Sequence, residues 1–233
     1  MDHLLDNPIW HALHGPHRAF AIGSGLAVHY PRDVAVFSAI ADPGAEAHQE
    51  LARGLPAGAE ARLVRRAVEP LPAGWIALKD VPLLQMVAAR FDGEVPEGPP
   101  IATLGLQNLG VVSSLVERTQ PGPFGPRTMT MGRYLGVFEG GELVAMAGER
   151  LRVSGYVELS AVCTDPRVRG RGLAAYLMRH LMRTAVARGE TPFLHVVPEN
   201  VGAIAIYRRL GFEVRADMHY LWRRPVEASA TRR

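Results

Sequence analysis

The order of elements after residue 130 most constrains what this chain can fold into. An apolar strand leads through a loop rich in arginine and glycine, residues 165–172, into a run whose leucines recur at helical spacing. The pattern predicts, in order, strands at 134–139, 143–150 and 156–163, a helix at 173–188, a strand at 193–197, a helix at 201–210, and strands at 212–215 and 219–222. An antiparallel meander that continues into alternating helices and strands predicts a mixed α/β sheet of the α+β kind.

The segment DGEVPEGPP, residues 92–100, is dense in proline, glycine and acidic residues and is the best linker in the chain. It divides a small α+β domain, residues 1–98, from a larger domain, residues 99–225, and we expect residues 226–233 to form a flexible tail. Apolar residues between Val81 and Phe91 recur at helical spacing, which favours a helix there. The other elements expected before the linker are strands at 19–22, 26–30, 34–40 and 61–68 and a helix at 46–53.

Composition excludes several classes of protein. Of the 233 residues, 48% are hydrophobic and 21% are charged, as in ordinary globular proteins. No window approaches 18 uninterrupted apolar residues, and the first ten residues lack the lysines of a signal peptide, so we expect a cytoplasmic protein without a membrane partner. The single cysteine, Cys163, excludes an intramolecular disulfide and a multi-cysteine zinc site, and no metal is expected.

Charge is distributed unevenly along the chain. Residues 118–233 contain 18 arginines, no lysine and 10 acids, whereas residues 1–117 contain 8 basic residues and 13 acids. A basic half indicates an anionic partner. Because Arg167, Arg169 and Arg171 lie in a loop that enters a helix, they favour a diphosphate over duplex DNA, which a groove-reading helix would contact along one exposed face. No nucleic-acid partner is expected.

The loop itself supports three interpretations. Gly170 and Gly172 allow close approach of the backbone, and the amides at the start of the helix attract phosphate. The segment from Gly170 to Ala175 also matches G-x-G-x-x-A, the dinucleotide fingerprint of NAD(P)-dependent oxidoreductases, although six residues separate it from the preceding strand. The third interpretation is an arginine-rich turn without a ligand.

The combination of Arg167-x-x-Gly170-x-Gly172 with NVGAIAIYRRLGF, residues 200–212, resembles the GNAT superfamily of acyl-CoA-dependent N-acyltransferases. The resemblance covers roughly residues 101–224 and is nearest to members similar to glycine N-acyltransferases. It implies a GNAT-type domain for residues 99–225, preceded by a domain that can be a degenerate half of the same fold.

The resemblance implies acetyl-CoA as the cosubstrate. It places the pantetheine arm against the end of the strand and against Asn200, and the pyrophosphate on the amides from Arg169 to Ala174. The cofactor-binding residues carried over by this match are Val162, Cys163, Thr164, Arg167, Val168, Arg169, Gly170, Arg171, Gly172, Leu173, Ala174, Asn200, Ala203 and Tyr207. Asn200 can equally serve only as the N-cap of its helix.

Direct transfer to an amine requires a proton for the departing thiolate and a neutral amine. Tyr207 matches the family tyrosine that acts as general acid, and a packed structural aromatic is its alternative. Glu158 in YVELSAV and His195 in FLHVV are candidate bases, each with a structural alternative. Cys163 has no histidine at triad spacing nearby and is expected to be a buried structural thiol.

The acceptor site is predicted in the loop QPGPFGPRT, residues 120–128, where Phe124 and Arg127 can line a pocket or form a rigid surface. The predicted function is acetyl transfer from acetyl-CoA to a primary amine of a small molecule or peptide. Amino acids, polyamines, antibiotics and protein N-termini all remain possible acceptors, and a homodimer is possible. A catalytically degenerate acyl-CoA-binding module is the main alternative.

Overall fold

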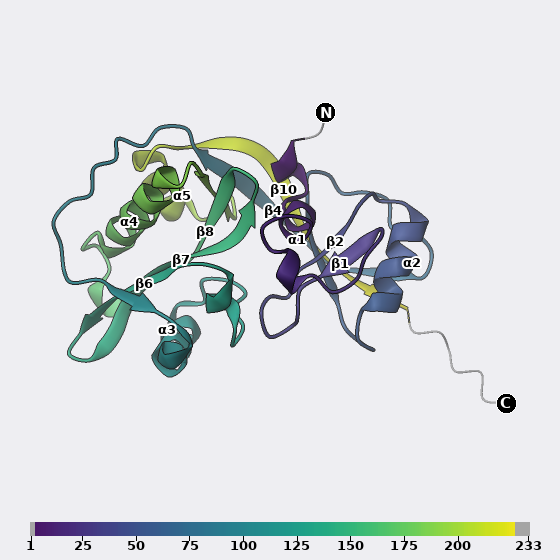
Figure 1. Cartoon of the computed structure of the whole chain (residues 1–233), viewed down its shortest axis with the longest axis horizontal. Coiled ribbons are helices and arrows are strands. Elements are labelled where there is room, and N and C mark those ends of the chain that lie inside the picture. The colour runs from purple at the N-terminus through teal and green to yellow at the C-terminus, as the bar shows by residue number, and fades with distance from the viewer. Residues whose placement is uncertain (1–2, 227–233) are drawn as a thin grey trace.

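An eight-stranded sheet runs through the described part of the chain, residues 3–226, in this computed structural model (Figure 1). Its strand order is β3-β10-β4-β9-β8-β7-β6-β5, and within these residues β8 and β9 are its only parallel neighbours. Two further strands, β1 and β2, form a separate antiparallel pair. The strands are β1 (Ala27–His29), β2 (Ser38–Ile40), β3 (Ala61–Arg65), β4 (Trp75–Ala88), β5 (Ala102–Leu104), β6 (Tyr134–Glu139), β7 (Glu142–Val153), β8 (Tyr156–Thr164), β9 (Thr191–Val196) and β10 (Phe212–Pro225).

Helices cover both faces of the part of the sheet around β7 and β8 (Figure 1). The α-helices are α1 (Pro8–Leu13), α2 (Ala45–Gly54), α3 (Leu109–Thr119), α4 (Leu173–Ala187) and α5 (Val201–Arg209). Leu177 and Leu181 of α4 pack in one core cluster with Leu159 of β8. Val112 of α3 packs in another with Met146 of β7. The amphipathic pattern of each helix therefore fixes its position on the sheet.

The mixed α/β sheet predicted from the sequence is confirmed, and the elements from β6 to α5 begin and end within three residues of their predicted limits. The prediction of a helix between Val81 and Phe91 is wrong, because most of this segment lies in β4. Gln85 and Met86, on successive positions, are both fully buried, so this part of the strand is covered on both faces, although residues 76–80 are exposed. A strand buried on both faces lacks the alternation of period two, and its apolar residues then imitate helical spacing.

Two smaller expectations also differ from the structure. The predicted strands 212–215 and 219–222 form one continuous strand, β10, with a bulge between Val214 and Ala216 in its pairing with β4. In place of a strand at 19–22, Arg18–Phe20 forms a 3₁₀ helix, and Ile22 makes a single antiparallel bridge to His29. Of the predicted tail, only Val226 lies within the described residues.

The sheet connects the two sides of the predicted linker. β3 and β4 precede residues 92–100, yet both pair with β10, and β4 also pairs with β9. Hydrogen bonding therefore crosses the predicted boundary at residue 98. A two-lobed shape is nevertheless visible in Figure 1, with α1, β1, β2 and α2 forming a lobe beside the helices α3, α4 and α5.

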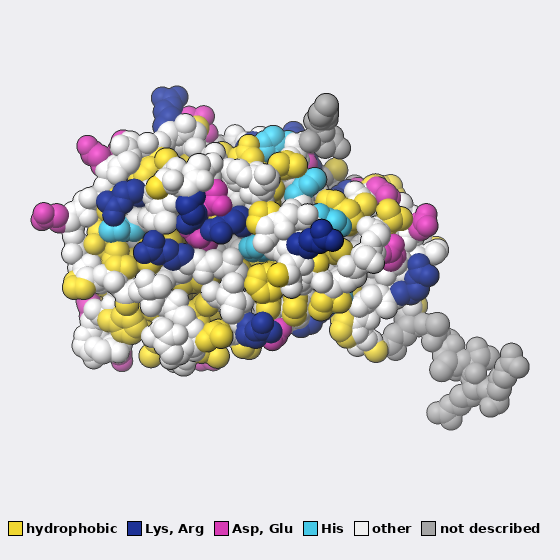
Figure 2. All heavy atoms as spheres, viewed as in Figure 1, with side chains coloured by type: hydrophobic (Ala, Val, Ile, Leu, Met, Phe, Trp, Pro, Cys, Tyr) yellow, Lys and Arg dark blue, Asp and Glu magenta, His cyan; other side chains and the backbone are white. Residues whose placement is uncertain are grey.

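The surface carries interleaved charges. On the face shown in Figure 2, basic side chains of the left lobe lie among acidic ones. Arg179 of α4 pairs with Asp92 at 3.1 Å, and Arg188, directly after α4, pairs with Glu149 at 2.8 Å. In the described residues, no helix is both long enough and apolar enough to span a membrane.

Candidate active site

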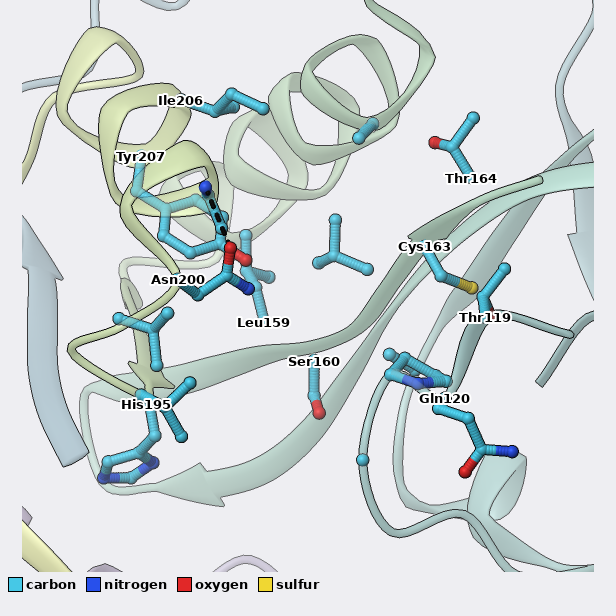
Figure 3. Close-up of a pocket in the computed structure, with 18 of the residues that line it drawn as sticks. Thr119, Gln120, Leu159, Ser160, Cys163, Thr164, His195, Asn200, Ile206 and Tyr207 are labelled. Atoms are coloured by element: carbon cyan, nitrogen blue, oxygen red, sulfur yellow. Dashed lines mark hydrogen bonds between the residues drawn. The ribbon is translucent and has the colours of Figure 1, made fainter. Parts of the chain in front are cut away.

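A cavity of about 780 Å³ opens where β8 and β9 separate. The two strands pair in parallel only from Tyr156 to Glu158, after which no register connects them although β8 continues to Thr164. Figure 3 shows this cavity with Leu159, Ser160, Cys163 and Thr164 of β8 along one side. Since each strand residue advances about 3.3 Å, the cavity follows β8 for about 20 Å from Glu158 to Thr164.

A bulge in β8 lies in the wall of this cavity. Met146 pairs with Cys163 and Gly148 pairs with Ser160, so Ala161 and Val162 together stand opposite one residue of β7. Ala161 has φ of 52°, in the left-handed region that non-glycine residues adopt at an energetic cost. A bulge leaves one residue unpaired with the neighbouring strand, so main-chain groups here are available to a ligand in the cavity.

The arginine and glycine loop leads from β8 to the start of α4. Gly170 has φ of 79°, and Gly172, the N-cap of α4, has φ of 77° and provides no side-chain cap. Leu173 and Ala174 at the first turn of the helix line the cavity. The first amides of a helix have no partner within the helix and carry the positive end of its dipole. This end of the cavity therefore suits a phosphate group.

The arginines of the loop have different positions. Arg169 and Arg171 line the cavity, and Arg171 also pairs with Glu139 at 2.7 Å. Arg167 does not line the cavity, because its guanidinium binds Asp165 at 2.9 Å and Glu142 at 2.6 Å. The sequence-based assignment of Arg167 to the ligand is therefore not supported, and Arg167 fixes the loop. The remaining predicted cofactor-binding residues line the cavity.

Asn200 and Tyr207 face the cavity from α5 and the turn before it (Figure 3). The Asn200 side-chain oxygen accepts a hydrogen bond of 3.2 Å from the Ala203 amide, so Asn200 caps α5. Its amide nitrogen is not used by the cap. Burial raises the pKa of the Tyr207 hydroxyl to about 12, so the phenol keeps its proton at neutral pH and can donate it.

Glu158 is fully buried and holds an ion pair with Arg150. Nε and Nη2 of Arg150 each donate to one carboxylate oxygen at 2.8 Å. Burial alone raises the pKa of the Glu158 carboxyl, but the charge and hydrogen bonds of Arg150 outweigh it and leave the pKa well below the usual range. A carboxylate that binds protons so weakly is a poor general base near neutral pH, so the structure argues against the predicted base role of Glu158.

His195 is held between Glu158 and a residue that sequence analysis missed. Its Nδ1 lies 2.8 Å from Glu158 Oε1, and its Nε2 lies 2.9 Å from Nε2 of Gln85 in β4. Gln85 Nε2 also donates to the Leu5 carbonyl at 2.9 Å. Because the amide nitrogen of Gln85 can only donate, His195 Nε2 accepts and Nδ1 carries the proton toward Glu158. Both ring nitrogens are thus occupied, which disfavours His195 as the base.

The two residues predicted for the acceptor site do not line the cavity. Phe124 packs edge-on against Tyr134 with ring centroids 5.9 Å apart, and Arg127 pairs with Asp33 at 3.1 Å. Gln120 of the same loop does line the cavity (Figure 3). The cavity wall instead includes residues that come before the linker or from β10, and these were not predicted: Phe37, Val64, Val81, Leu83 and Tyr220. For Gln85, the partner of His195, the sequence did contain a signal: it is a single polar residue inside the apolar run VPLLQMVAA.

Cys163 is buried, with 7% of its surface exposed, and lines the cavity near Thr119. Burial raises the pKa of its thiol, which keeps it in the less reactive protonated form. Within residues 3–226, no group of three or more histidine, cysteine, aspartate or glutamate side chains can hold a metal ion.

Comparison with known proteins shows which protein family has this fold and sequence. A model described as FR47-like protein matches residues 134–222. A crystal structure of a putative acetyltransferase of the GNAT family from Novosphingobium aromaticivorans is 40% identical, with a TM-score of 0.85 over 96% of this chain and 99% of that one. The chain belongs to the GNAT family. Its sheet, with one parallel pair among the described strands, also excludes the doubly wound dinucleotide fold, so the NAD(P) interpretation of Gly170 to Ala175 is wrong.

Other GNAT proteins are similar to this chain over a shorter aligned length or at lower sequence identity. N-alpha-acetyltransferase RimI of Mycobacterium tuberculosis is 39% identical over 83 residues, which span 34% of this chain and 51% of RimI. The uncharacterised N-acetyltransferase YobR of Bacillus subtilis is 33% identical over 69 residues, 28% of its length, so this chain spans about half of RimI and less than a third of YobR. A GNAT structure from Kribbella flavida, at 22% identity and a TM-score of 0.60, shares the fold across 92% of this chain.

Proposed function

We propose that this GNAT protein transfers an acetyl group from acetyl-CoA directly to a primary amine. The observation that carries the proposal is one continuous cavity that joins the uncapped amides of α4 to the hydroxyl of Tyr207. The residues present suit coenzyme A. Ideal Cβ atoms at Gly170 and Gly172 would meet no atom within 4 Å, so the loop leaves open space beside its backbone.

In the proposed complex, amides from Arg169 to Ala174 hold the diphosphate, and Arg169 adds a charge-assisted contact. The pantetheine arm lies along the unpaired end of β8, beside the amide nitrogen of Asn200. Bound acetyl-CoA supplies an activated thioester, whose C–S bond breaks as the acceptor nitrogen forms its new C–N bond. The residues of the chain hold the acyl donor in position along the cavity and supply a proton beside Tyr207.

Tyr207 donates its hydroxyl proton to the departing sulfur in this mechanism, and the proton that the acceptor nitrogen loses as the amide forms returns through solvent to the Tyr207 phenolate. Its raised pKa keeps that proton available throughout the neutral range. Glu158 and His195 are engaged by Arg150 and Gln85, so the acceptor ammonium loses its proton to solvent before the attack. The rate is then expected to rise with pH until the acceptor amine is mostly neutral.

The test is release of coenzyme A thiol from acetyl-CoA by the full chain in the presence of an amine panel. The panel includes α-amino compounds, because the related RimI is named as an N-alpha-acetyltransferase. Amine-dependent thiol release supports the proposal. Calorimetric binding of acetyl-CoA without release by any amine would instead support the acyl-CoA-binding module.

A further inference from the structure

The cavity continues past the bulge of β8 into a region that the acyl donor does not require. Here its wall is built by the first lobe and the long strands β4 and β10. We define the acceptor end by its apolar lining side chains: Phe37, Val64, Val81, Leu83 and Tyr220. Phe37 and Val64 are each only 4% exposed, so the wall is formed by well-packed side chains. This surface suits an apolar group on the acceptor.

Charge in the cavity restricts the acceptor further. Glu158 is the only acidic side chain that lines it within the described residues, whereas four arginines do so: Arg150, Arg169, Arg171 and Arg209. Both oxygens of Glu158 are taken by Arg150, and one also by His195. An acceptor with a second ammonium group would therefore bury that charge without a partner, which is strongly unfavourable.

Arg150 retains a donor for a ligand. Nε and Nη2 bind Glu158, while Nη1 has no hydrogen-bond partner among the described residues. The guanidinium lies 4.8 Å from the centre of the Phe37 ring, so it borders the apolar wall directly. Its position is fixed by the bidentate pair, and a guanidinium is suited to bind a carboxylate.

We propose that the acceptor is a free amino acid with an apolar side chain, whose carboxylate binds Nη1 of Arg150. This proposal rests on the proposed acetyl transfer. The apolar side chain lies against Phe37 and its neighbours, and the α-amino group is directed along β8 toward Tyr207. Polyamines and aminoglycoside antibiotics are excluded by the lack of a free acidic group in the described wall.

The experiment compares acceptors that differ in one group, using the full chain and thiol release from acetyl-CoA. L-Phenylalanine is expected to exceed L-phenylalaninamide in kcat/KM by about tenfold or more, because the amide loses a charge-assisted hydrogen bond. L-Leucine is expected to exceed glycine and spermidine. Equal or better turnover of the amide, of phenethylamine or of spermidine overturns the proposal.

The variant that tests Arg150 removes the ion pair as a whole, because Arg150→Met alone would leave Glu158 buried without a partner. Arg150→Met with Glu158→Leu keeps an apolar core and is expected to reduce the preference for L-phenylalanine over its amide to within about twofold. Thermal unfolding verifies that the double variant is folded. The matched control is Arg169→Met, which is expected to weaken acetyl-CoA binding while leaving the ratio between the two acceptors intact. An unchanged ratio in the double variant contradicts the assignment to Arg150.

A binding measurement tests the acceptor end independently of the proposed acetyl transfer. If no amine releases thiol, acetyl transfer is refuted, and calorimetry with N-acetyl-L-phenylalanine and its amide still tests the acceptor end. Binding of the carboxylate about tenfold tighter than the amide supports the site. Equal binding of the two compounds, or binding of neither, overturns it.

Discussion

Tyr207 is the single side chain on which the proposed proton transfer depends. Replacing it in Tyr207→Phe keeps the ring and removes the donor, so turnover is expected to fall about 10²-fold. Acetyl-CoA affinity is expected to be nearly unchanged, because the ring still packs beside Phe212 with centroids 6.1 Å apart. Steady-state thiol release and calorimetry measure the two effects.

Tyr176→Phe provides the control for that substitution. The Tyr176 hydroxyl donates to the Pro99 carbonyl at 3.1 Å and lies outside the cavity wall, so turnover should be retained. Equal turnover of Tyr207→Phe and the unmodified protein would reject Tyr207 as the general acid.

Glu158 gives a prediction about stability and pH. Its folded pKa lies below the unfolded value of 4.5, so its contribution to the free energy of unfolding is fully present above that value and is lost as pH falls through the folded pKa. Glu158→Gln is therefore expected to destabilise the protein by about 3 kcal/mol near neutral pH, since Arg150 loses its charged partner. Urea unfolding should show this difference shrinking below about pH 4.

The same variant addresses the base role. Because Glu158 stays ionised, the acidic limb of the pH–rate profile should persist in Glu158→Gln, even where the rate itself is lower. Disappearance of that limb would restore Glu158 as the base, and a destabilisation that is independent of pH would refute the depressed pKa.

For individual residues such as Glu158, the sequence predicted the location in the fold better than the chemical role. Glu158 was placed near the site because it lies in the strand that enters the loop, and it does line the cavity. Its partner Arg150 lies in β7, and which residues face each other there depends on the register shifts of the β7–β8 pair. A register shift of one residue changes the face on which a side chain lies, and a single sequence gives no direct signal of it.

In the proposed complex, the amides at the start of α4 hold the diphosphate of the acyl donor. Gly172→Ala places a side chain at φ of 77°, which costs about 1 kcal/mol and shifts the first amides of the helix. Acetyl-CoA affinity is expected to fall about fivefold to tenfold with little change in the KM of the acceptor. Calorimetry for acetyl-CoA and acceptor kinetics measure these two quantities.

Gly189, just beyond the other end of α4, provides a matched control. It has φ of 74°, and an ideal Cβ there would also meet no atom within 4 Å. Gly189→Ala should therefore impose similar strain without affecting acetyl-CoA binding. Similar losses of affinity in both variants would mean that general destabilisation, and not the amides of α4, explains the effect.

Elements with local signals were predicted well. α4 and α5 are bounded by glycines and by the Asn200 cap, and the β6–β7 hairpin turns at Gly140-Gly141. β4 begins directly after Gly74, but no glycine lies near its other end before Gly93, and the burial of its second half is determined by strands far away in the sequence. Its apolar run therefore fits either type of element until the surrounding sheet is known.

At the scale of the whole molecule, the shared sheet predicts that the C-terminal segment does not fold alone. A fragment of residues 99–225 retains β9 and β10 but lacks β4, which pairs with both. We expect it to lack a cooperative unfolding transition and to aggregate through the exposed strand edges. Circular dichroism and urea unfolding of the fragment, compared with residues 1–225, measure this.

Cooperative unfolding of the 99–225 fragment would contradict that expectation and favour an independent domain. The predicted boundary at residue 98 was based on composition, which identifies an exposed connection but not the pairing of strands on its two sides. Two residues of the cavity wall were missed for a related reason: Val64 reaches the cavity through the pairing of β3 with β10, and Phe37 packs against Tyr220 of β10.

The position of β10 between β3 and β4 has a consequence for biosynthesis. Both flanking strands leave the ribosome well before their shared neighbour has been translated. β3 then has no strand of the described sheet to pair with, and β4 remains without most of its interstrand hydrogen bonds until β10 emerges. The nascent polypeptide therefore cannot complete this sheet until β10 has been translated, and chaperones that shield such strands are expected to improve its yield.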